Sequence, residues 1–142
     1  MAEKILLVDD EAEFLEALSE RMRVRGMDVV TSASAREALE SVEQGGFDAV
    51  VLDLMMPGMD GLEALRILKQ KDPKLQVILL TGHATVEKGV EAIKSGAMDL
   101  LEKPADIEVL TEKIKQASAQ RMLLVSQEAE DKIKDILASK GW

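Results

Sequence analysis

Five short apolar segments recur along the chain, and each is followed by a longer segment with helical periodicity. The apolar segments are residues 5–8, 27–31, 49–52, 75–80 and 98–101. Their lengths suit β-strands, and the first, third and fourth lack alternating polar residues, as expected for strands buried on both faces of a parallel sheet. The sequence therefore predicts an α/β domain with helices on both sides of a parallel sheet.

A doubly wound, flavodoxin-like (βα)5 arrangement is a common solution for such a pattern, with five parallel strands in the order 2-1-3-4-5. Residues that can begin or end the intervening helices support it. The expected helix starts are Ser34 with Glu37, Asp60, Thr85 and Asp106, and the expected stops are Gly26 and Gly96. In the fourth helix, we expect Val86, Val90 and Ile93 to form the inner face.

The C-terminal segment is longer than this fold requires. Ile107, Leu110, Ile114 and Ala117 suit a fifth helix on the sheet, but the apolar phase then shifts to residues 122–137. The shift predicts a bend, a second helix or a new packing partner, although continuous helix is also allowed. We divide the chain into a compact domain, residues 1–119, and a helical extension, residues 120–142. The extension is expected to form a homodimer, or else to fold back on its own domain.

Composition narrows the possible functions. The 142 residues suit one compact domain, and no segment is long and apolar enough for a membrane span, so we expect a cytoplasmic protein. There is no cysteine and one histidine, which leaves hard, oxygen-bound metals as candidates. The net charge of −9, without a basic cluster, disfavours direct binding to nucleic acid or anionic membranes.

Polar residues follow the predicted strands at their carboxyl ends. Asp9, Asp10 and Glu11 follow the first strand, Asp53 the third, Thr81 the fourth and Lys103 the fifth. Ligands bind beyond this edge in open α/β sheets, where the strand order reverses. Each residue alone has an ordinary explanation, such as a turn, a helix cap or a solvated lysine. Their joint position at one edge favours a functional site.

Asp9, Asp10 and Asp53 are expected to lie at the point where the strand order reverses. Three neighbouring carboxylates raise one another's pKa unless a cation neutralises them. Mg²⁺ is the candidate, since it is commonly held by one or two carboxylates together with a phosphate and water. Methionine sulfur prefers softer metals, so Met55, Met56 and Met59 are expected to serve in packing.

Residues 4–119 resemble the receiver domain of bacterial two-component response regulators. The resemblance rests on Val8-Asp9-Asp10-Glu11, on residues 52–61 (LDLMMPGMDG), on Leu80-Thr81-Gly82-His83, and on residues 95–104 (SGAMDLLEKP). The last two segments are most similar to receivers of the nitrogen-regulator type. The resemblance implies a phosphorylation switch that takes its phosphoryl group from a histidine kinase or a phosphotransfer protein and controls an output partner.

The resemblance also implies roles for individual residues. Asp53 is the phosphoryl acceptor, so the protein catalyses part of its own modification without being a conventional enzyme. Asp10 binds Mg²⁺ directly and Asp9 largely through water, with Asp53 and the carbonyl of Met55 as further ligands. Thr81 and Lys103 contact the phosphoryl group, and Lys103-Pro104 is expected to be a cis bond. Pro57 and Gly58 are expected to form a tight turn, and Gly61 makes room for the next helix.

Three residues depart from the family pattern. Leu100 stands where many receivers have an aromatic residue that changes rotamer, so coupling is expected to run through the loop after Thr81 and the fourth helix. Met55 and His83 flank the expected path of the hydrolytic water. An apolar Met55 predicts slow self-dephosphorylation, whereas His83 is expected to be a partly exposed loop residue with no role in it.

Three other functions fit less well. A haloacid-dehalogenase phosphatase has a second aspartate two residues after its nucleophile, where this chain has Met55. A nucleotide or flavin binder needs a phosphate-binding loop after the first strand, where Asp9, Asp10 and Glu11 would repel phosphate. A pseudo-receiver has usually lost one of the acidic or lysine positions, and all are present here.

Overall fold

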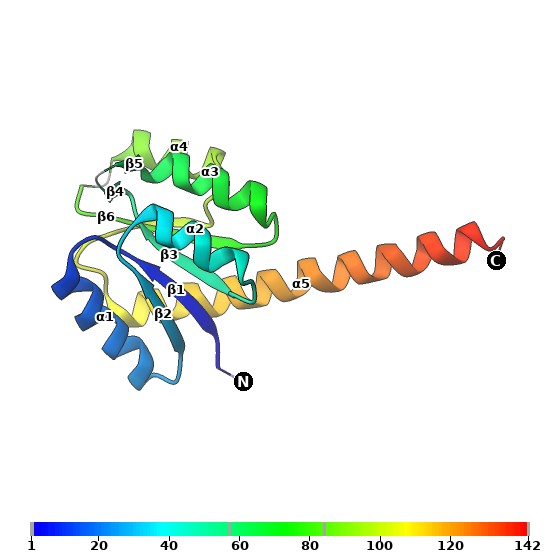
Figure 1. Ribbon diagram of the computed structural model, residues 1–142, viewed down its shortest axis with the longest axis horizontal. Coiled ribbons are helices and arrows are strands. Elements are labelled where there is room, and N and C mark those ends of the chain that lie inside the picture. Colours follow the sequence, from blue (N-terminus) through cyan, green and yellow to red (C-terminus); the bar gives the residue numbers. More distant parts are fainter. Residues whose placement is uncertain (1, 57, 84, 142) are drawn as a thin grey trace.

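The computed structural model describes residues 2–56, 58–83 and 85–141. Its main sheet contains five parallel strands in the order β2-β1-β3-β6-β7 (Figure 1). In chain order these are β1 (Lys4–Val8), β2 (Asp28–Ser32), β3 (Ala49–Asp53), β6 (Gln76–Thr81) and β7 (Asp99–Glu102). The predicted order 2-1-3-4-5 is therefore confirmed. Each strand lies within one residue of its predicted position at either end.

Helices cover both faces of this sheet (Figure 1). α1 (Ala12–Val24) and α5 (Ile107–Ser139) pack with alternate residues of the strands in one core, which contains Leu7, Met22 and Ile114. α2 (Ala35–Glu43), α3 (Gly61–Lys71) and α4 (Val86–Lys94) pack on the other face, around Leu52 and Leu65. Because β1, β3 and β6 are covered on both sides, most of their residues are fully buried apolar side chains, and the polar ones lie at the strand ends.

The predicted helix caps are present. Ser34 accepts a hydrogen bond from the Glu37 N–H, and the Thr85 hydroxyl accepts one from the Lys88 N–H. Asp60 and Asp106 cap α3 and α5 with their carboxylates. At the start of α3, a Cβ on Gly61 would lie 2.5 Å from the Leu54 carbonyl oxygen, so this close approach requires glycine.

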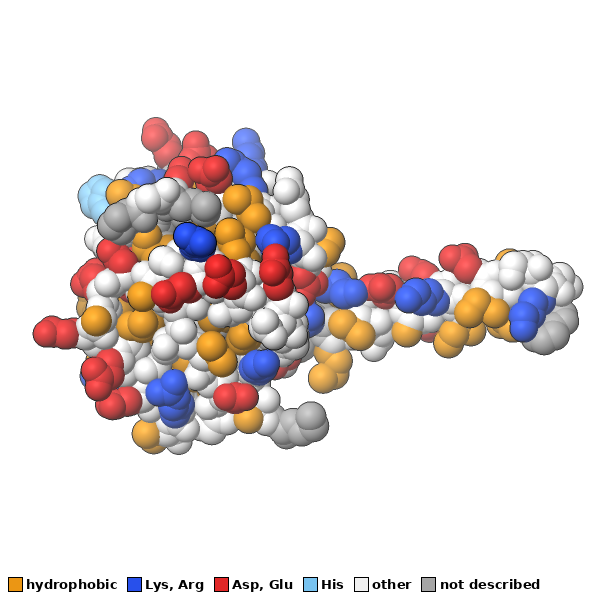
Figure 2. Space-filling model, viewed as in Figure 1, with side chains coloured by type: hydrophobic (Ala, Val, Ile, Leu, Met, Phe, Trp, Pro, Cys, Tyr) orange, Lys and Arg blue, Asp and Glu red, His pale blue; other side chains and the backbone are white. Residues whose placement is uncertain are grey.

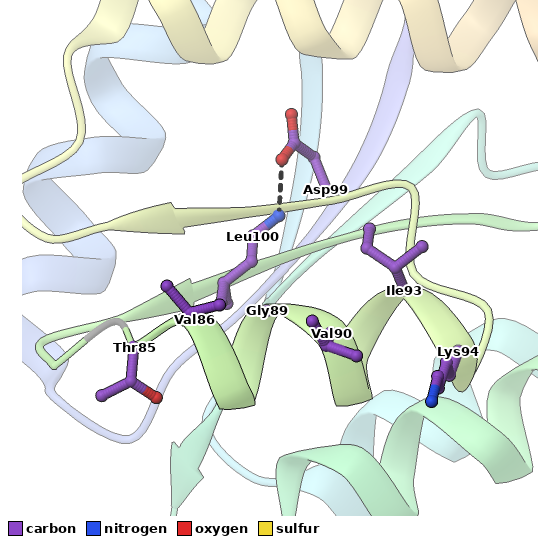
Figure 3. Close-up of a pocket in the computed structure, with 8 residues that line it drawn as sticks. All are labelled: Thr85, Val86, Gly89, Val90, Ile93, Lys94, Asp99 and Leu100. Carbon is purple, nitrogen blue, oxygen red and sulfur yellow. Dashed lines mark hydrogen bonds between the residues drawn. The ribbon is translucent and has the colours of Figure 1, made fainter.

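The predicted inner face of the fourth helix is wrong. Val86, Val90 and Ile93 of α4 are 86%, 47% and 53% exposed, whereas Ala92 is fully buried. α4 lies close to β7 through small residues, and at Gly89 a Cβ would already be 3.9 Å from Leu100. The larger side chains are therefore displaced outward, where they line a groove of about 730 Å³ beside Leu100 (Figure 3).

A short hairpin follows β3 and was not predicted. β4 (Met55–Met56) pairs antiparallel with β5 (Met59–Asp60) immediately before α3. Gly58 has a positive φ of 86°, which fits the expected tight turn, and Pro57 lies outside the described residues. The hairpin places the backbone of Met55 beside the end of β3.

α5 is a single uninterrupted helix of 33 residues, so the chain has no bend or second helix between residues 107 and 139. Its first half packs on the sheet, and its second half projects away from the body (Figure 1). None of the helices among the described residues is long and apolar enough to cross a membrane.

A cluster of charged side chains holds α5 where it leaves the body, at the amino ends of the strands. Arg121 pairs with Asp72 at 2.9 Å, and Glu128 pairs with Lys74. Lys69 fixes the same loop by donating to the carbonyls of Pro73 and Leu75, each at 2.8 Å. We call these five charged residues, Lys69, Asp72, Lys74, Arg121 and Glu128, the amino-edge cluster.

Candidate functional site

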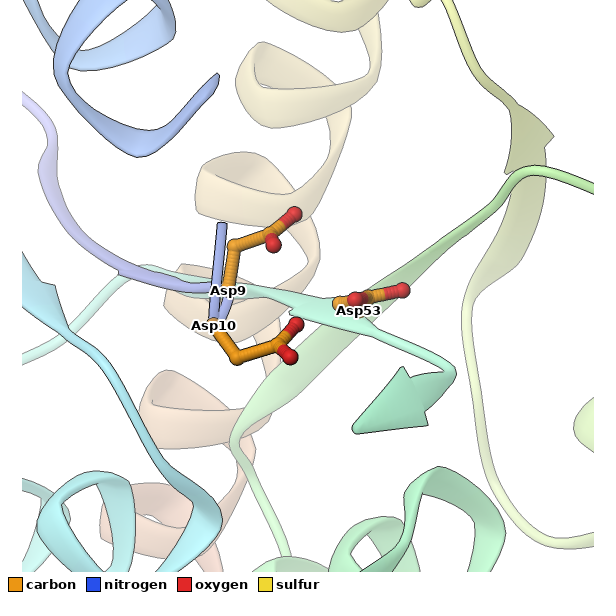
Figure 4. A group of neighbouring side chains, drawn as sticks. All are labelled: Asp9, Asp10 and Asp53. Carbon is orange, nitrogen blue, oxygen red and sulfur yellow. The ribbon is translucent and has the colours of Figure 1, made fainter. Parts of the chain in front are cut away.

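Three carboxylates meet at the carboxyl ends of β1 and β3 (Figure 4). Asp9 and Asp10 follow β1, Asp53 ends β3, and one ligand oxygen from each lies within 4.8 Å of the others. The pairing of Val8 with Leu52 in adjacent strands brings these residues together. Asp9 and Asp53 are buried, whereas Asp10 is exposed, so the group is open to solvent on one side.

Backbone groups orient the two buried carboxylates. Asp53 Oδ1 accepts a hydrogen bond from the Met55 N–H at 3.2 Å, and Asp9 Oδ1 accepts one from the Glu11 N–H at 2.9 Å. Each bond spans two residues, which is typical of an aspartate that ends a strand and begins a turn. The second oxygen of each carboxylate therefore stays available to a cation.

Lys103 supplies positive charge from the end of β7. Its Nζ lies 2.7 Å from Asp9 Oδ2, 3.6 Å from Asp53 Oδ2 and 3.5 Å from Glu11 Oε1. It also lies over the Phe14 ring, 4.3 Å from the centroid. The following peptide bond, Lys103-Pro104, is cis, as predicted. The site thus brings one cation to a cluster of three carboxylates.

The charges of the site are unbalanced around Asp53. Burial raises the pKa of Asp53 above 3.8, and the charges of Asp9 and Asp10 add to the rise, although the Met55 N–H and Lys103 oppose it. Burial alone would lower the pKa of Lys103, but its hydrogen bond with Asp9 and the neighbouring carboxylates outweigh burial and raise it. Lys103 therefore remains charged, and one ammonium is too little for three carboxylates.

Thr81 ends β6 beside the carboxylates and is fully buried. Its hydroxyl accepts a hydrogen bond from the His83 N–H at 3.2 Å, and its carbonyl accepts one from the Lys103 N–H at 2.8 Å. Every side chain that the sequence predicted for the site, together with the backbone of Met55, therefore lies around one edge of the sheet. His83 is exposed, as expected for a loop residue.

A cavity of about 690 Å³ opens beside the carboxylates, between the hairpin and the starts of α3 and α4. Asp10 lines it, together with Met55, Met56 and Lys88. The Met55 side chain is 63% exposed, so it lies at the rim and not in the core. Its expected role in packing is therefore wrong, because the hairpin turns this side chain away from the sheet.

Two contacts of Lys103 were not predicted from the sequence, namely those with the Phe14 ring and the Glu11 carboxylate. A signal was available for Phe14, which lies four residues after Asp10 and therefore one helical turn from the site. Periodicity alone assigns this residue only to the apolar stripe of the first helix. It contributes to that core and also supports the ammonium.

Comparison with known proteins agrees with this geometry. Residues 5–115 match the family model described as response regulator receiver domain. The C4-dicarboxylate transport transcriptional regulatory protein DctD of Pseudomonas aeruginosa is 37% identical over 123 residues, which cover 86% of this chain and 26% of DctD. The transcriptional regulatory protein ZraR of Escherichia coli K12 is 38% identical over 115 residues, 81% of this chain and 26% of ZraR. The chain thus spans about a quarter of these relatives.

Solved structures show the same fold. A receiver domain protein from Clostridium thermocellum superposes with a TM-score of 0.82 and 33% identity, covering 86% of this chain and 98% of that one. The beryllofluoride-activated NtrC4 receiver domain dimer gives a TM-score of 0.78 and 36% identity, covering 83% and 98%. The fold and its acidic edge are those of a receiver domain, the phosphorylation-dependent switch of two-component signalling. The chain belongs to the response regulator receiver domain family, and its relatives confirm the nitrogen-regulator-like subgroup.

Proposed function

We propose that Asp53 accepts a phosphoryl group from a phosphohistidine on a sensor kinase or phosphotransfer protein in the cytoplasm. One observation carries the proposal: Asp53 is a buried carboxylate with one oxygen held by the Met55 N–H and the other 3.6 Å from Lys103. This oxygen is the nucleophile. It forms the new bond to phosphorus as the phosphorus–nitrogen bond breaks, and the electron pair returns to the imidazole of the donor.

The residues present fit Mg²⁺, because three carboxylates supply only hard oxygen donors. Asp10 and Asp53 would hold the ion together with the Met55 carbonyl, and Asp9 would act largely through water. When bound, Mg²⁺ supplies positive charge that offsets the charge of the phosphoryl oxygens. The excess of carboxylates over ammonium groups around Asp53 supports this assignment.

Lys103 and Thr81 are the other two groups of this chain that we assign to the phosphoryl group. The Lys103 ammonium, already 3.6 Å from Asp53, offsets charge that develops on the transferred oxygens. The Thr81 hydroxyl accepts a hydrogen bond from His83 in this structure and has its own proton to donate. It would turn toward the phosphoryl group and move the loop that follows it.

This movement would reach the output through α4, which begins shortly after the Thr81 loop. Thr85 caps α4, and the exposed groove of α4 lies against Leu100 (Figure 3). Leu100 has no aromatic ring, so the rotamer change of an aromatic residue cannot carry the signal at this position. An output partner would sense the position of α4. We further propose that residues 1–119 form the switching domain and residues 120–142 the extension that transmits its state.

Chemical mapping tests this function. The protein is incubated with acetyl phosphate and Mg²⁺, reduced with borohydride and digested, so that an acyl phosphate becomes a homoserine that mass spectrometry can locate. We expect homoserine at position 53 and at neither Asp9 nor Asp10. Homoserine at another carboxylate, or at none after complete recovery of these peptides, would contradict the proposal.

A further inference from the structure

Lys103 is enclosed to a degree that is uncommon for a lysine. On the face shown in Figure 2, lysine and arginine side chains stand exposed among acidic ones. In contrast, only 14% of the Lys103 side chain is exposed. Its Nζ lies 2.7 Å from Asp9 Oδ2, 3.6 Å from Asp53 Oδ2 and 4.3 Å from the centroid of the Phe14 ring. Carboxylates and an aromatic face therefore replace much of the water around this ammonium.

The Phe14 ring attracts the ammonium in a different way from a carboxylate. A cation within about 6 Å of a ring centroid is attracted by the negative face of the ring, and the attraction grows when water is excluded. At 4.3 Å, no water fits between Nζ and the ring. The ring offers no lone pair for a short hydrogen bond, so it leaves the N–H groups of Lys103 to oxygen acceptors.

Phe14 is itself fixed by the fold. It lies in the first turn of α1 and packs against the core on that face of the sheet. A cavity of about 220 Å³ adjoins the ring and is lined also by Pro104 and Ala105, which directly follow Lys103. A smaller side chain at position 14 would enlarge this cavity beside the ammonium and give Lys103 room to move away from Asp53.

Glu11 offers the ammonium a competing position. Its Oε1 lies 3.5 Å from Lys103 Nζ, but 68% of the Glu11 side chain is exposed, so an ammonium that moved toward it would move toward water. Glu11 directly precedes α1, and Phe14 lies in the first turn of that helix. The start of α1 thus presents one group that attracts Lys103 outward and one that covers it beside Asp53.

We propose that Phe14 is a positioning residue for phosphoryl transfer, because its ring holds the Lys103 ammonium partly dehydrated and close to Asp53. The proposal rests on the function proposed above for Asp53. Developing charge on a phosphoryl group is offset most strongly by an ammonium that water does not screen and that is in place before the reaction. Phe14 supplies both conditions through Lys103. Its replacement should therefore slow the transfer and leave Asp53 as the acceptor.

The chain contains a second pair of the same kind at the opposite edge of the sheet. Lys4, at the start of β1, has its Nζ 4.7 Å from the centroid of the Phe47 ring. Phe47 is buried, whereas Phe14 is half-buried. These two residues are the only phenylalanines in the sequence. Phe47 is therefore a matched control, whose replacement should cost at least as much packing without affecting phosphorylation.

Initial rates of phosphorylation by acetyl phosphate and Mg²⁺, followed by intact mass, compare the two phenylalanines. Phe14→Leu should be slower than the wild type by about threefold or more, the scale of one partly dehydrated cation–π contact. Phe47→Leu should phosphorylate at the wild-type rate, although it should lose more thermal stability. Equal rates for the two variants would overturn the proposal.

A double-mutant cycle separates an action of the ring through Lys103 from a general loss of packing. In the Lys103→Ala background, Phe14→Leu should have no further effect on the rate, because the group that the ring positions is gone. A purely structural role of Phe14 would slow phosphorylation by the same factor in both backgrounds, and that result would refute the proposal.

Fluorinated phenylalanines test the charge distribution of the ring at nearly constant size, so the test stays decisive even where Phe14→Leu fails to fold. In Phe47→Leu they enter position 14 alone, and fluorination weakens the negative face of the ring. The phosphorylation rate should fall stepwise from phenylalanine to para-fluorophenylalanine to pentafluorophenylalanine. A constant rate along this series would show that the ring acts only through its bulk and would exclude the proposed role.

A spectroscopic measurement detects the contact without phosphorylation or Mg²⁺. With para-fluorophenylalanine in the otherwise natural chain, the two rings give two ¹⁹F signals. Lys103→Ala should shift the Phe14 signal and leave the Phe47 signal in place, and Lys4→Ala should do the reverse. A Phe14 signal that does not respond to Lys103→Ala would overturn the proposal. Failure of the wild type to accept a phosphoryl group at Asp53 would contradict the proposed function but leave these shifts unchanged, so the two failures are distinguishable.

Discussion

The two edges of the sheet carry clusters of charged residues that differ in one respect. At the carboxyl edge, Asp9, Asp10 and Asp53 share a single close cation, Lys103, and the pKa of Asp53 is raised. At the amino edge, Asp72 and Glu128 have a cation each. The carboxyl-edge residues lie at the ends of β1, β3 and β7, whereas the amino-edge pairs join the loop before β6 to α5. The carboxyl edge has an excess of carboxylates and needs a ligand, whereas the charges of the amino edge are balanced within the chain.

This balance distinguishes a binding site from a structural cluster in such a sheet. A balanced cluster is satisfied within the chain, and here it fixes the direction of α5. In a partly buried acidic cluster with too few cations, the carboxylates repel one another until a cation binds or one of them accepts a phosphoryl group. Substitutions at the two edges should therefore differ in their effects on phosphorylation and stability. The effects should be largest at the centre of the carboxyl edge and smallest at the amino edge.

Removal of Lys103 should have the largest effect. Lys103→Ala takes away the only ammonium that contacts Asp53 among the described residues, so phosphorylation by acetyl phosphate should slow by about 100-fold, the scale for loss of one charge-stabilising group. Lys88→Ala is the control, since Lys88 reaches only the His83 carbonyl at the rim. Equal rates for the two variants, measured by intact mass over time, would show that the carboxyl edge does not depend on its central cation.

Binding of Mg²⁺ should stabilise the carboxyl edge alone. At ten times its Kd, the ion should add about 1.4 kcal/mol to the free energy of unfolding of the wild type. Asp53→Asn should lose most of this gain, whereas Asp135→Asn, on the exposed end of α5, should keep it. Thermal unfolding with and without Mg²⁺ measures the difference. An equal gain in all three proteins would indicate nonspecific binding.

The pH dependence of stability without divalent cations follows from Asp53. Its pKa in the folded chain lies above 3.8, so the folded state holds the proton more tightly than the unfolded state. Asp53 therefore favours folding at low pH, and this contribution is lost as the pH rises through the folded pKa. In the presence of chelator at neutral pH, the Tm of Asp53→Asn should lie a few degrees above that of the wild type. At acid pH the two Tm values should nearly coincide. A gap that does not close on acidification would contradict this assignment.

Replacement of Met55 should change the lifetime of the phosphoryl group several-fold. Met55 is exposed at the rim of the site and cannot orient the hydrolytic water, whereas an asparagine there can donate and accept hydrogen bonds. Met55→Asn should therefore dephosphorylate faster than wild type. The decay of the phosphorylated protein after removal of acetyl phosphate is followed by intact mass, and equal decay rates would refute the expectation.

The smallest effect is expected at the amino edge. A double-mutant cycle on Arg121 and Asp72 should give a coupling free energy of about 0.5–1 kcal/mol, because the pair is partly buried. The exposed pair Arg36–Glu40 is the control and should give about 0.3–0.5 kcal/mol. Neither cycle should alter phosphorylation. A phosphorylation defect in Arg121→Ala would show that the two edges are not functionally separate.

Much of this molecule can be predicted from sequence because its signals are local or follow from topology. Strand-length apolar segments predict the sheet, and the rule for its carboxyl edge predicts that Asp9, Asp53 and Lys103 lie together. The inner face of α4 was missed because periodicity detects apolar residues, whereas close packing against β7 selected Gly89 and Ala92. The exposure of the Met55 side chain depends on a hairpin that no local pattern encodes. The contact of the Phe14 ring had only a weak signal, its spacing of four residues from Asp10, which the apolar periodicity of the first helix masks.

The shift of apolar phase in α5 was visible in the sequence, but its meaning was not. The same apolar pattern is compatible with a continuous helix and with a bent one. The contacts of Arg121 and Glu128 with the body distinguish the two, because they hold the helix in a straight course. Long-range ion pairs of this kind join residues 49 and 54 positions apart, which no local pattern reveals.

The most direct test of the central claim is the intact mass of the protein after incubation with acetyl phosphate and Mg²⁺. Asp53 is the carboxylate that the sheet, the Met55 N–H and Lys103 jointly position. We predict that the wild type gains one phosphoryl group and that Asp53→Asn gains none. Equal phosphorylation of the two proteins, or none in a folded wild type, would contradict the assignment of Asp53 as the acceptor.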